Sequence, residues 1–242
     1  MSAGFFPFRV FILMLSSGES RQTIRMVTNM RKKKNIGMAL LAGFLLWTWA
    51  VCVVDVQPIG PLGSRVGLAR LNGFFHRLTG VHFWLYTLTD WLSLIPLGLV
   101  GCLGLWGLAQ WIRRRDLCRV DRSLLMLGRF YLTVLVCYGL FEVWTVNYRP
   151  VLIDGLLEGS YPSSTTMLSL CVMPTAWWQL RERIRSSLLR RCTGWIVGAF
   201  TAFLVVGRVL SGVHWLSDII GGMLLSSGLL GIYSGLAFRN TR

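Results

Sequence analysis

The sequence lacks the clusters of side chains that hold most structural metals and disulfide frameworks. Its six cysteines stand apart, mostly within apolar runs, at positions 52, 102, 118, 137, 171 and 192. There is no CxxC pair and no Cys/His cluster, so the pattern supports neither a zinc site nor a set of disulfides. We interpret the cysteines as small hydrophobic side chains.

Charged residues are scarce, and acidic residues are the scarcest. Asp, Glu, Lys and Arg make up 14% of the 242 residues, with 10 acidic against 25 basic side chains and a net charge of +15. Hydrophobic residues make up 54%, and the mean hydropathy is +0.57. This composition excludes an ordinary soluble globular protein and predicts an integral membrane protein.

No internal repeat, low-complexity linker or heptad array is present, so we expect one membrane domain. A segment that crosses a bilayer must satisfy its own backbone polar groups, which makes helices the expected form. We predict an all-α bundle of six transmembrane helices over residues 36–54, 91–111, 124–145, 163–180, 192–209 and 216–238. The predicted division is an N-terminal extension (1–35), the membrane domain (36–238) and a short tail (239–242).

Basic residues gather in every second connection. They lie before the first span, between the second and third, and between the fourth and fifth, at 31–34, 113–122 and 181–191. The positive-inside rule then places both termini in the cytoplasm, as expected for a multi-pass plasma-membrane (inner-membrane) protein. Loop position explains most of the net charge, so we expect anionic lipid, and no nucleic acid, as its partner. The small size and the lack of N-x-S/T sequons in the outer loops indicate a bacterial source.

Two segments leave alternatives open. Residues 5–15 are apolar but too short to span, and Met26 or Met30 would also make plausible starts, so we interpret residues 1–29 as a non-essential extension. Residues 61–80 mix apolar and basic side chains. This stretch is either an amphipathic helix on the outer membrane face or an ordinary connecting loop.

Three polar clusters fall on the same predicted membrane face. They are Asn-Tyr-Arg-Pro at 147–150, Tyr-Pro-Ser-Ser-Thr-Thr at 161–166, and RVLSGVHWLSD at 208–218. Ionisable groups beside a membrane span are costly unless they have a role. Their convergence indicates a functional site, although 162–165 also fits a simple helix start and Arg149 an interfacial arginine.

The third cluster holds the residue types that phosphoryl transfer through a histidine needs. An arginine such as Arg208 can bind phosphoryl oxygens, and His214 can attack phosphorus. Asp218 follows four residues later, a spacing that places both side chains on one face if the segment is helical. A helix start with hydroxyl side chains is also a ready anion site.

Together the clusters resemble the three motifs of the type 2 phosphatidic acid phosphatase (PAP2) superfamily, which includes membrane lipid phosphatases and related haloperoxidases. The family has KxxxxxxRP, PSGH and SRxxxxxHxxxD. This chain has ExxxxxxRP at 142–150, PSST at 162–165 and GRxxxxxHxxxD at 207–218. The resemblance covers roughly the last two-thirds of the chain, and the third motif is the most specific.

The resemblance implies a role for each matching residue. His214 would be the nucleophile that forms a phosphohistidine, and Asp218 would support its imidazole. The phosphoryl oxygens would be bound by Arg149, Arg208, Ser163 and Ser164. The family needs no metal or other cofactor, and no protein partner can be inferred.

Two departures from the family pattern bear on the reaction. Glu142 stands in place of a phosphate-binding lysine, so it points away, donates a proton or pairs with Arg149. Thr165 stands in place of the histidine that protonates the leaving group, a loss worth about 10²–10⁴ in rate. A phosphate leaving group needs that proton least, so we expect a phosphatase for a lipid phosphate and preferentially for an isoprenoid or other lipid diphosphate. A lipid phosphotransferase, or a catalytically silent lipid-binding or transport protein, stays an alternative.

Overall fold

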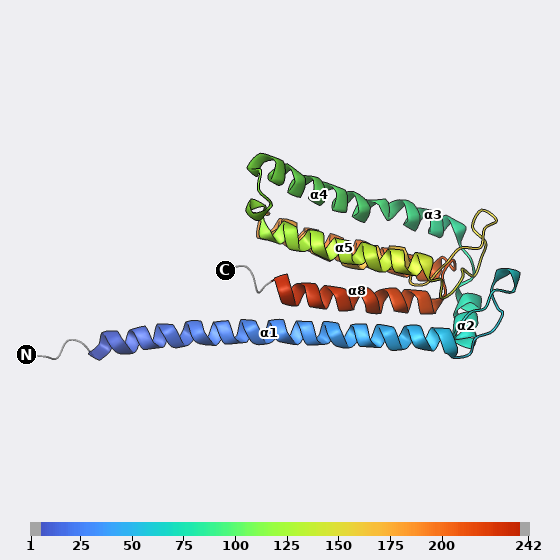
Figure 1. Ribbon diagram of the computed structural model, residues 1–242, viewed down its shortest axis with the longest axis horizontal. Helices are drawn as coiled ribbons and strands as arrows, with labels where there is room; N and C mark the ends of the chain where they lie inside the picture. Colours follow the sequence, from blue (N-terminus) through green and yellow to red (C-terminus); the bar gives the residue numbers. More distant parts are fainter. Residues whose placement is uncertain (1–5, 238–242) are drawn as a thin grey trace, which may run out of the picture.

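The computed structural model describes residues 6–237, with side-chain detail from residue 28 onward. The predicted tail 239–242 and the first five residues lie outside the described residues. Within them every long element is a helix, which confirms the all-α prediction. Six long helices run side by side (Figure 1): α1 (Phe6–Val53), α4 (Leu94–Arg114), α5 (Arg122–Val143), α6 (Ser164–Arg181), α7 (Ser187–Leu210) and α8 (Leu216–Ala237).

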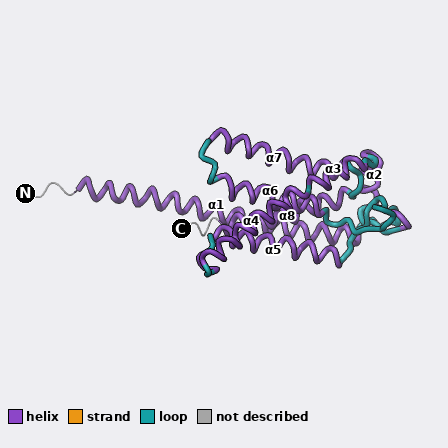
Figure 2. The backbone as a smooth tube through the Cα atoms, turned by 90° about the horizontal axis from the view of Figure 1, so that it is seen from above, coloured by secondary structure: helices purple, strands orange, loops and turns teal. Residues whose placement is uncertain are grey.

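Shorter elements connect these helices. Helix α2 (Ala69–Thr79) lies at one end of the bundle, and α3 (Phe83–Leu92) leads almost directly into α4 (Figure 2). Two 3-10 turns, η1 (Pro61–Gly63) and η2 (Leu117–Arg119), complete the regular structure of the described residues. The helix predicted to begin at residue 91 is therefore the second half of a longer apolar stretch that starts at α3.

The two ends of the bundle differ in charge. At one end, here called the site end, lie α2, the starts of α6 and α8, and the three polar clusters (Figure 1). The opposite end, here called the basic end, holds the α4–α5 and α6–α7 connections with the arginines of 113–122 and 181–191. The basic connections predicted to lie on one side of the membrane are therefore together at one end of the bundle, and the polar clusters are at the other.

Among the described residues, five segments are long and apolar enough to cross a membrane, one fewer than predicted: Thr28–Val53, Phe83–Arg114, Arg122–Val143, Ser187–Leu210 and Leu216–Ala237. The predicted span that is not among these five is the fourth, 163–180, which corresponds to α6; this helix runs among the others but is less apolar. Helix α6 contacts α4, α5, α7 and α8, and it buries polar side chains such as Thr166, Ser169 and Thr175. A helix surrounded by protein needs fewer apolar side chains than one that faces lipid.

Helices α1 and α8 pack closely because glycines line their contact. A Cβ atom added to Gly231 would lie 2.8 Å from the Cα atom of Gly37. One added to Gly228 would lie 2.6 Å from the side chain of Leu41. Small residues allow such approach, and close van der Waals packing is a main source of helix association in membranes. Helix α1 is continuous from Phe6, so most of the predicted extension and the first span form one helix.

Helix α1 also contacts the site end directly. The indole Nε1 of Trp47 donates to the carbonyl oxygen of Ser217 at 3.0 Å. The Thr48 hydroxyl donates to its own helix at the Phe44 carbonyl oxygen, and therefore accepts from the Tyr161 hydroxyl at 2.6 Å. The first helix is in this way fastened to the segments that carry the second and third polar clusters.

The segment 61–80 contains a helix rather than only a loop. Helix α2 is held against the start of α8 by Asn72, which is fully buried. Its side-chain amide donates to the Ser217 hydroxyl at 2.9 Å and accepts from the Ser217 backbone N–H at 3.0 Å. Arg70 lies on the same helix with an exposed side chain. The amphipathic-helix alternative is the one that fits.

The glycine contact predicts a specific sensitivity to side-chain size. Gly231→Leu should lower the thermal unfolding temperature by several degrees, because overpacking costs about 1–3 kcal/mol. Gly101→Leu on α4 is the matched control, since a Cβ atom there has no neighbour within 4 Å. Unfolding of purified protein in detergent measures both, and equal midpoints would contradict the prediction.

Candidate active site

The third polar cluster folds as a tight loop between α7 and α8. Gly212 has a φ of +67°, and a Cβ atom on it would lie 1.9 Å from the Gly80 carbonyl oxygen. Only glycine fits both demands. The neighbouring Ser211 carbonyl oxygen accepts from the His82 backbone N–H at 2.9 Å. The loop that carries His214 is thus held against the segment between α2 and α3.

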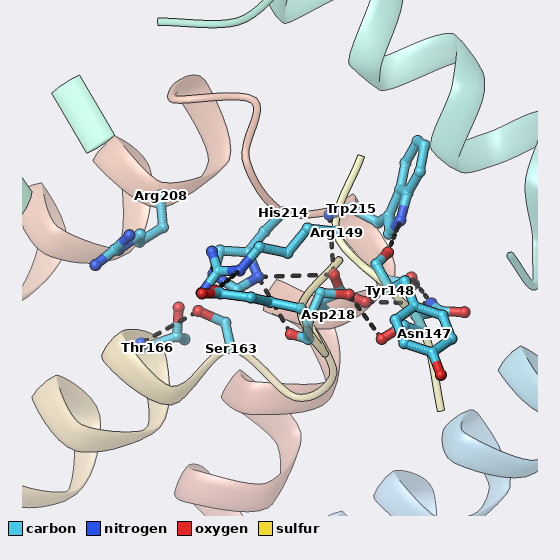
Figure 3. Close-up of polar contacts among 12 residues, drawn as sticks. Asn147, Tyr148, Arg149, Ser163, Thr166, Arg208, His214, Trp215 and Asp218 are labelled. Atoms are coloured by element: carbon cyan, nitrogen blue, oxygen red, sulfur yellow. Dashed lines mark hydrogen bonds and ion pairs between the residues drawn. The ribbon is translucent and has the colours of Figure 1, made fainter. Parts of the chain in front are cut away.

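His214 is buried, with one ring nitrogen bound and the other directed at an arginine (Figure 3). Nδ1 lies 3.1 Å from the Ser160 carbonyl oxygen, and because a carbonyl can only accept, Nδ1 carries the proton. Nε2 therefore keeps its lone pair and accepts from Nη1 of Arg149 at 3.2 Å. The free lone pair makes Nε2 the nucleophilic atom of the ring.

The charge state of His214 suits a nucleophile. Burial lowers the pKa of His214 to about 4; the bond to Asp218 opposes this shift, and the positive charge of Arg149 adds to it. The imidazole is therefore neutral near pH 7. A neutral imidazole can attack phosphorus, whereas a protonated one cannot.

Asp218 is fully buried and held by three donors. Its Oδ2 accepts from the Trp215 backbone N–H at 2.9 Å, and its Oδ1 accepts from the Asn147 amide at 3.2 Å and the Ser217 hydroxyl at 3.4 Å. Oδ2 lies 3.7 Å from His214 Nδ1. This distance is long for a hydrogen bond but short for an ion pair once the ring becomes positive.

The closeness of His214 and Asp218 does not come from helical periodicity. Helix α8 begins at Leu216, so His214 lies in the loop before it. The two side chains meet because the chain turns into α8 there, with the Trp215 N–H bound to the Asp218 carboxylate. The predicted pair is present, and the helical face suggested by its spacing is not what brings it together.

Arg149 is placed by Glu158. Its Nε lies 3.0 Å from Glu158 Oε2, and its backbone N–H donates to the Glu158 carbonyl oxygen at 2.9 Å. The carboxylate that pairs with Arg149 is therefore Glu158, not Glu142 as considered from the sequence. The sequence gives no sign of this pair, since Glu158 lies beyond a loop and outside every motif.

Arg208 is almost fully buried, with its side chain 2% exposed. Its Nη2 lies 2.6 Å from Oδ1 of Asp90 on α3, while its Nε and Nη1 atoms have no partner. Its guanidinium carbon lies 4.9 Å from the centre of the Tyr86 ring, and that of Arg149 lies 5.8 Å from the same centre. The two arginines therefore lie close together, and Arg208 keeps unused donors that suit phosphoryl oxygens.

The second cluster forms the start of α6. The Ser163 hydroxyl caps the helix by accepting from the Thr166 backbone N–H at 3.5 Å. The Ser163 backbone N–H donates to the Asp218 carbonyl oxygen at 3.1 Å, which joins this start to the third cluster. Helix starts attract anions because their N–H groups are free and their dipole is positive there.

A small cavity of about 70 Å³ lies where the clusters meet, and a larger apolar groove of about 660 Å³ adjoins it. The cavity is lined by Tyr138, Phe141, Glu142, Thr145, Arg149, Gly159, Ser160, Tyr161, Pro162, Ser164, Met167 and His214. The groove runs between α4, α5 and α6 and shares Tyr138, Ser164 and Met167 with the cavity. Among the described side chains, no three His, Cys, Asp or Glu residues are grouped as metal ligands. Arg149 brings a positive charge to the cavity wall.

Comparison with known protein families identifies this arrangement. Residues 133–242, from the middle of α5 onward, match the model described as the PAP2 superfamily. This part of the chain is similar to the PAP2 superfamily. The matched segment contains all three polar clusters, as the motif resemblance predicts.

A solved structure shares the PAP2 fold over a longer stretch. It is described as the crystal structure of the first transmembrane PAP2 type phosphatidylglycerolphosphate phosphatase from Bacillus subtilis. The TM-score is 0.60 at 18% sequence identity, with 85% of this chain and 98% of that chain covered. At this identity the likeness shows the fold alone. Among curated protein sequences, the comparison finds no match.

The two departures from the PAP2 motifs fall in different places. Glu142 lines the small cavity together with Arg149 and His214. Thr165 lines the apolar groove and is absent from the cavity wall, where its neighbour Ser164 lies. Thr165, which replaces the family histidine, therefore faces the groove, and Glu142, which replaces the family lysine, faces the cavity.

The neutral state of His214 predicts a stability loss in mild acid. The unfolded chain binds the proton with a pKa of about 6.5, and the folded chain with one of about 4. Stability is therefore complete above pH 6.5 and falls as the pH drops toward 4, because the unfolded state binds more protons. Unfolding temperatures between pH 7.5 and pH 5 measure this, and His214→Asn should show a shallower dependence. An equally steep fall in the variant would contradict the assignment.

Proposed function

We propose that this protein is a membrane phosphatase that hydrolyses a lipid phosphate, preferentially an isoprenoid or other lipid diphosphate. The observation that carries the proposal is the neutral, buried His214, whose Nε2 meets Arg149 at the wall of a phosphate-sized cavity. Similarity to the PAP2 superfamily supports phosphatase chemistry. The adjoining apolar groove supports a substrate with a long hydrocarbon chain.

The first step forms a covalent phosphoryl enzyme. His214 Nε2 attacks phosphorus, a P–O bond breaks, and the leaving group departs with the electron pair. The Nδ1 proton stays directed at the Ser160 carbonyl oxygen, and the positive charge that develops on the ring is stabilised by Asp218. Arg149 and Arg208 bind the phosphoryl oxygens with donors that are held in place beforehand.

The leaving group sets the preference for a diphosphate. A lipid alkoxide must gain a proton as it departs, and Thr165 cannot supply one near neutral pH. A lipid monophosphate, released from a diphosphate, is stable without that proton. The site is therefore suited to cleaving the phosphoanhydride bond of a diphosphate rather than a phosphate ester.

The membrane orientation follows from charge. With the basic end in the cytoplasm, the site end faces the outer side of a bacterial plasma membrane, and both termini are cytoplasmic. The substrate then reaches the cavity from the outer leaflet through the groove.

The covalent step makes a direct prediction. Brief incubation with a lipid diphosphate labelled in its terminal phosphate should give an acid-labile, base-stable phosphoprotein, and His214→Ala should give none. A label that forms quickly but hydrolyses only slowly, and passes to an added lipid or sugar acceptor, would instead indicate the phosphotransferase alternative. No label under rapid quench, together with lipid binding, would indicate the silent protein.

The leaving-group argument predicts a substrate order. Purified protein should turn over a polyprenyl diphosphate at least about 100-fold faster than phosphatidic acid, since general acid catalysis contributes about 10²–10⁴ to ester cleavage. Vanadate, which mimics the phosphoryl group, should inhibit both. Faster cleavage of the monoester at equal detergent and lipid concentrations would refute the preference.

A further inference from the structure

Release of the phosphoryl group needs a base that the nucleophile itself cannot provide. In a phosphohistidine, Nε2 is bonded to phosphorus, and Nδ1 already carries the proton directed at the Ser160 carbonyl oxygen. Neither nitrogen can then take a proton from the attacking water. A separate proton acceptor at the cavity is required if hydrolysis is to be fast.

The cavity wall contains one such group. Among the described residues that line it, Glu142 is the only carboxylate. The other polar groups of the wall are hydroxyls, such as those of Tyr138, Thr145 and Ser164, and the guanidinium of Arg149. Hydroxyls and guanidinium groups do not accept a proton near neutral pH, whereas a carboxylate does.

The surroundings of Glu142 leave its carboxylate available. It lies in the last turn of α5, four residues after Tyr138, whose hydroxyl is hydrogen-bonded to it. The salt bridges of the described residues leave Glu142 unpaired, because Arg149 pairs with Glu158 and Arg208 with Asp90. The side chain is exposed at the end of α5 and is not covered by neighbouring protein.

We propose that Glu142 is the general base of the hydrolysis step, held at the cavity wall by Tyr138. This role rests on the phosphohistidine of the proposed function. The water oxygen bonds to phosphorus as its proton passes to the Glu142 carboxylate. The N–P bond breaks, its electron pair returns to His214 Nε2, and inorganic phosphate leaves.

The same assignment accounts for the two departures together. A Glu142 that acts only as a base in the second step gives no proton to the leaving group in the first, which agrees with a substrate whose leaving group needs none. A lysine at this position would bind phosphate but could not activate water while protonated. The exchange of lysine for glutamate therefore moves the residue from substrate binding to hydrolysis.

The test separates formation of the phosphoprotein from its hydrolysis. Rapid quench with farnesyl diphosphate, labelled in its terminal phosphate, is followed in the wild type, Glu142→Gln and Glu142→Lys. Both variants should form the phosphoprotein and then lose it at least about 100-fold more slowly, so that it accumulates. Formate should accelerate its loss in Glu142→Ala by acting as the missing carboxylate. Hydrolysis at the wild-type rate in Glu142→Gln, or faster turnover in Glu142→Lys, would overturn the proposal.

A control makes the outcome specific. Glu182→Gln removes a carboxylate at the C-terminal end of α6, at the basic end and away from the cavity, so it should not cause the phosphoprotein to accumulate. Equal accumulation in both Gln variants would overturn the proposal by showing a general charge effect. If the wild type forms no phosphoprotein, the proposed function fails; if it forms one that Glu142→Gln hydrolyses normally, only the base assignment fails.

Discussion

The buried carboxylate of Asp218 holds the site end of the bundle together. It accepts from the backbone of the histidine loop, from Asn147 in the first polar cluster and from Ser217 in α8. Its backbone carbonyl oxygen accepts from the backbone N–H of Ser163 in the second cluster. A buried charge is costly unless fully paired, so each of these partners is fixed by the need to satisfy it. The carboxylate therefore joins the first and third motifs, and the backbone carbonyl group of the same residue joins the second.

The two arginines of the site are also paired with charged groups. Each has its own carboxylate, Asp90 for Arg208 and Glu158 for Arg149. Without these carboxylates, the two guanidinium groups would repel each other strongly in a site of low dielectric. The two ion pairs offset this repulsion when no phosphoryl group is bound. The Asp90 and Glu158 side chains are partly exposed, whereas Arg208 is buried. The carboxylates can exchange toward water while the cation stays in place for an incoming dianion.

The local sequence was sufficient to predict the helices and the residues that match the family motifs. Apolar length and loop charge are local properties, and the third motif sets Arg208, His214 and Asp218 within eleven residues. The charge partners could not be predicted, because Asp90 lies 118 residues before Arg208 and no spacing links them. From the sequence, Asn147 was only part of the first polar cluster. Its hydrogen bond to Asp218 could not be predicted, since an amide side chain can bind many kinds of partner. A helix was predicted at 163–180 and is present as α6, but it is less apolar than the five candidate spans because its surroundings are largely protein.

Glu142 and Thr165 show where a motif comparison stops. A comparison with the family motifs names the residue that is missing at each position and implies a site of lower activity. The structure adds where each substitute lies, one at the phosphate cavity and the other at the apolar groove. The consequence for the reaction comes from that placement, because a carboxylate at the cavity and a hydroxyl in the groove have different uses.

The attachment of α1 has a further consequence. The family match begins at residue 133, yet Trp47 and Thr48 bind Ser217 and Tyr161 in the segments around His214. Glycines lock the same helix against α8 farther down the bundle. A rotation of α1 about its axis would shift the first turn of α8 and, through it, the carboxylate that orients the imidazole. The first helix therefore sets the angular position of the last, and the precision of the site depends on a part of the chain that carries none of its chemistry.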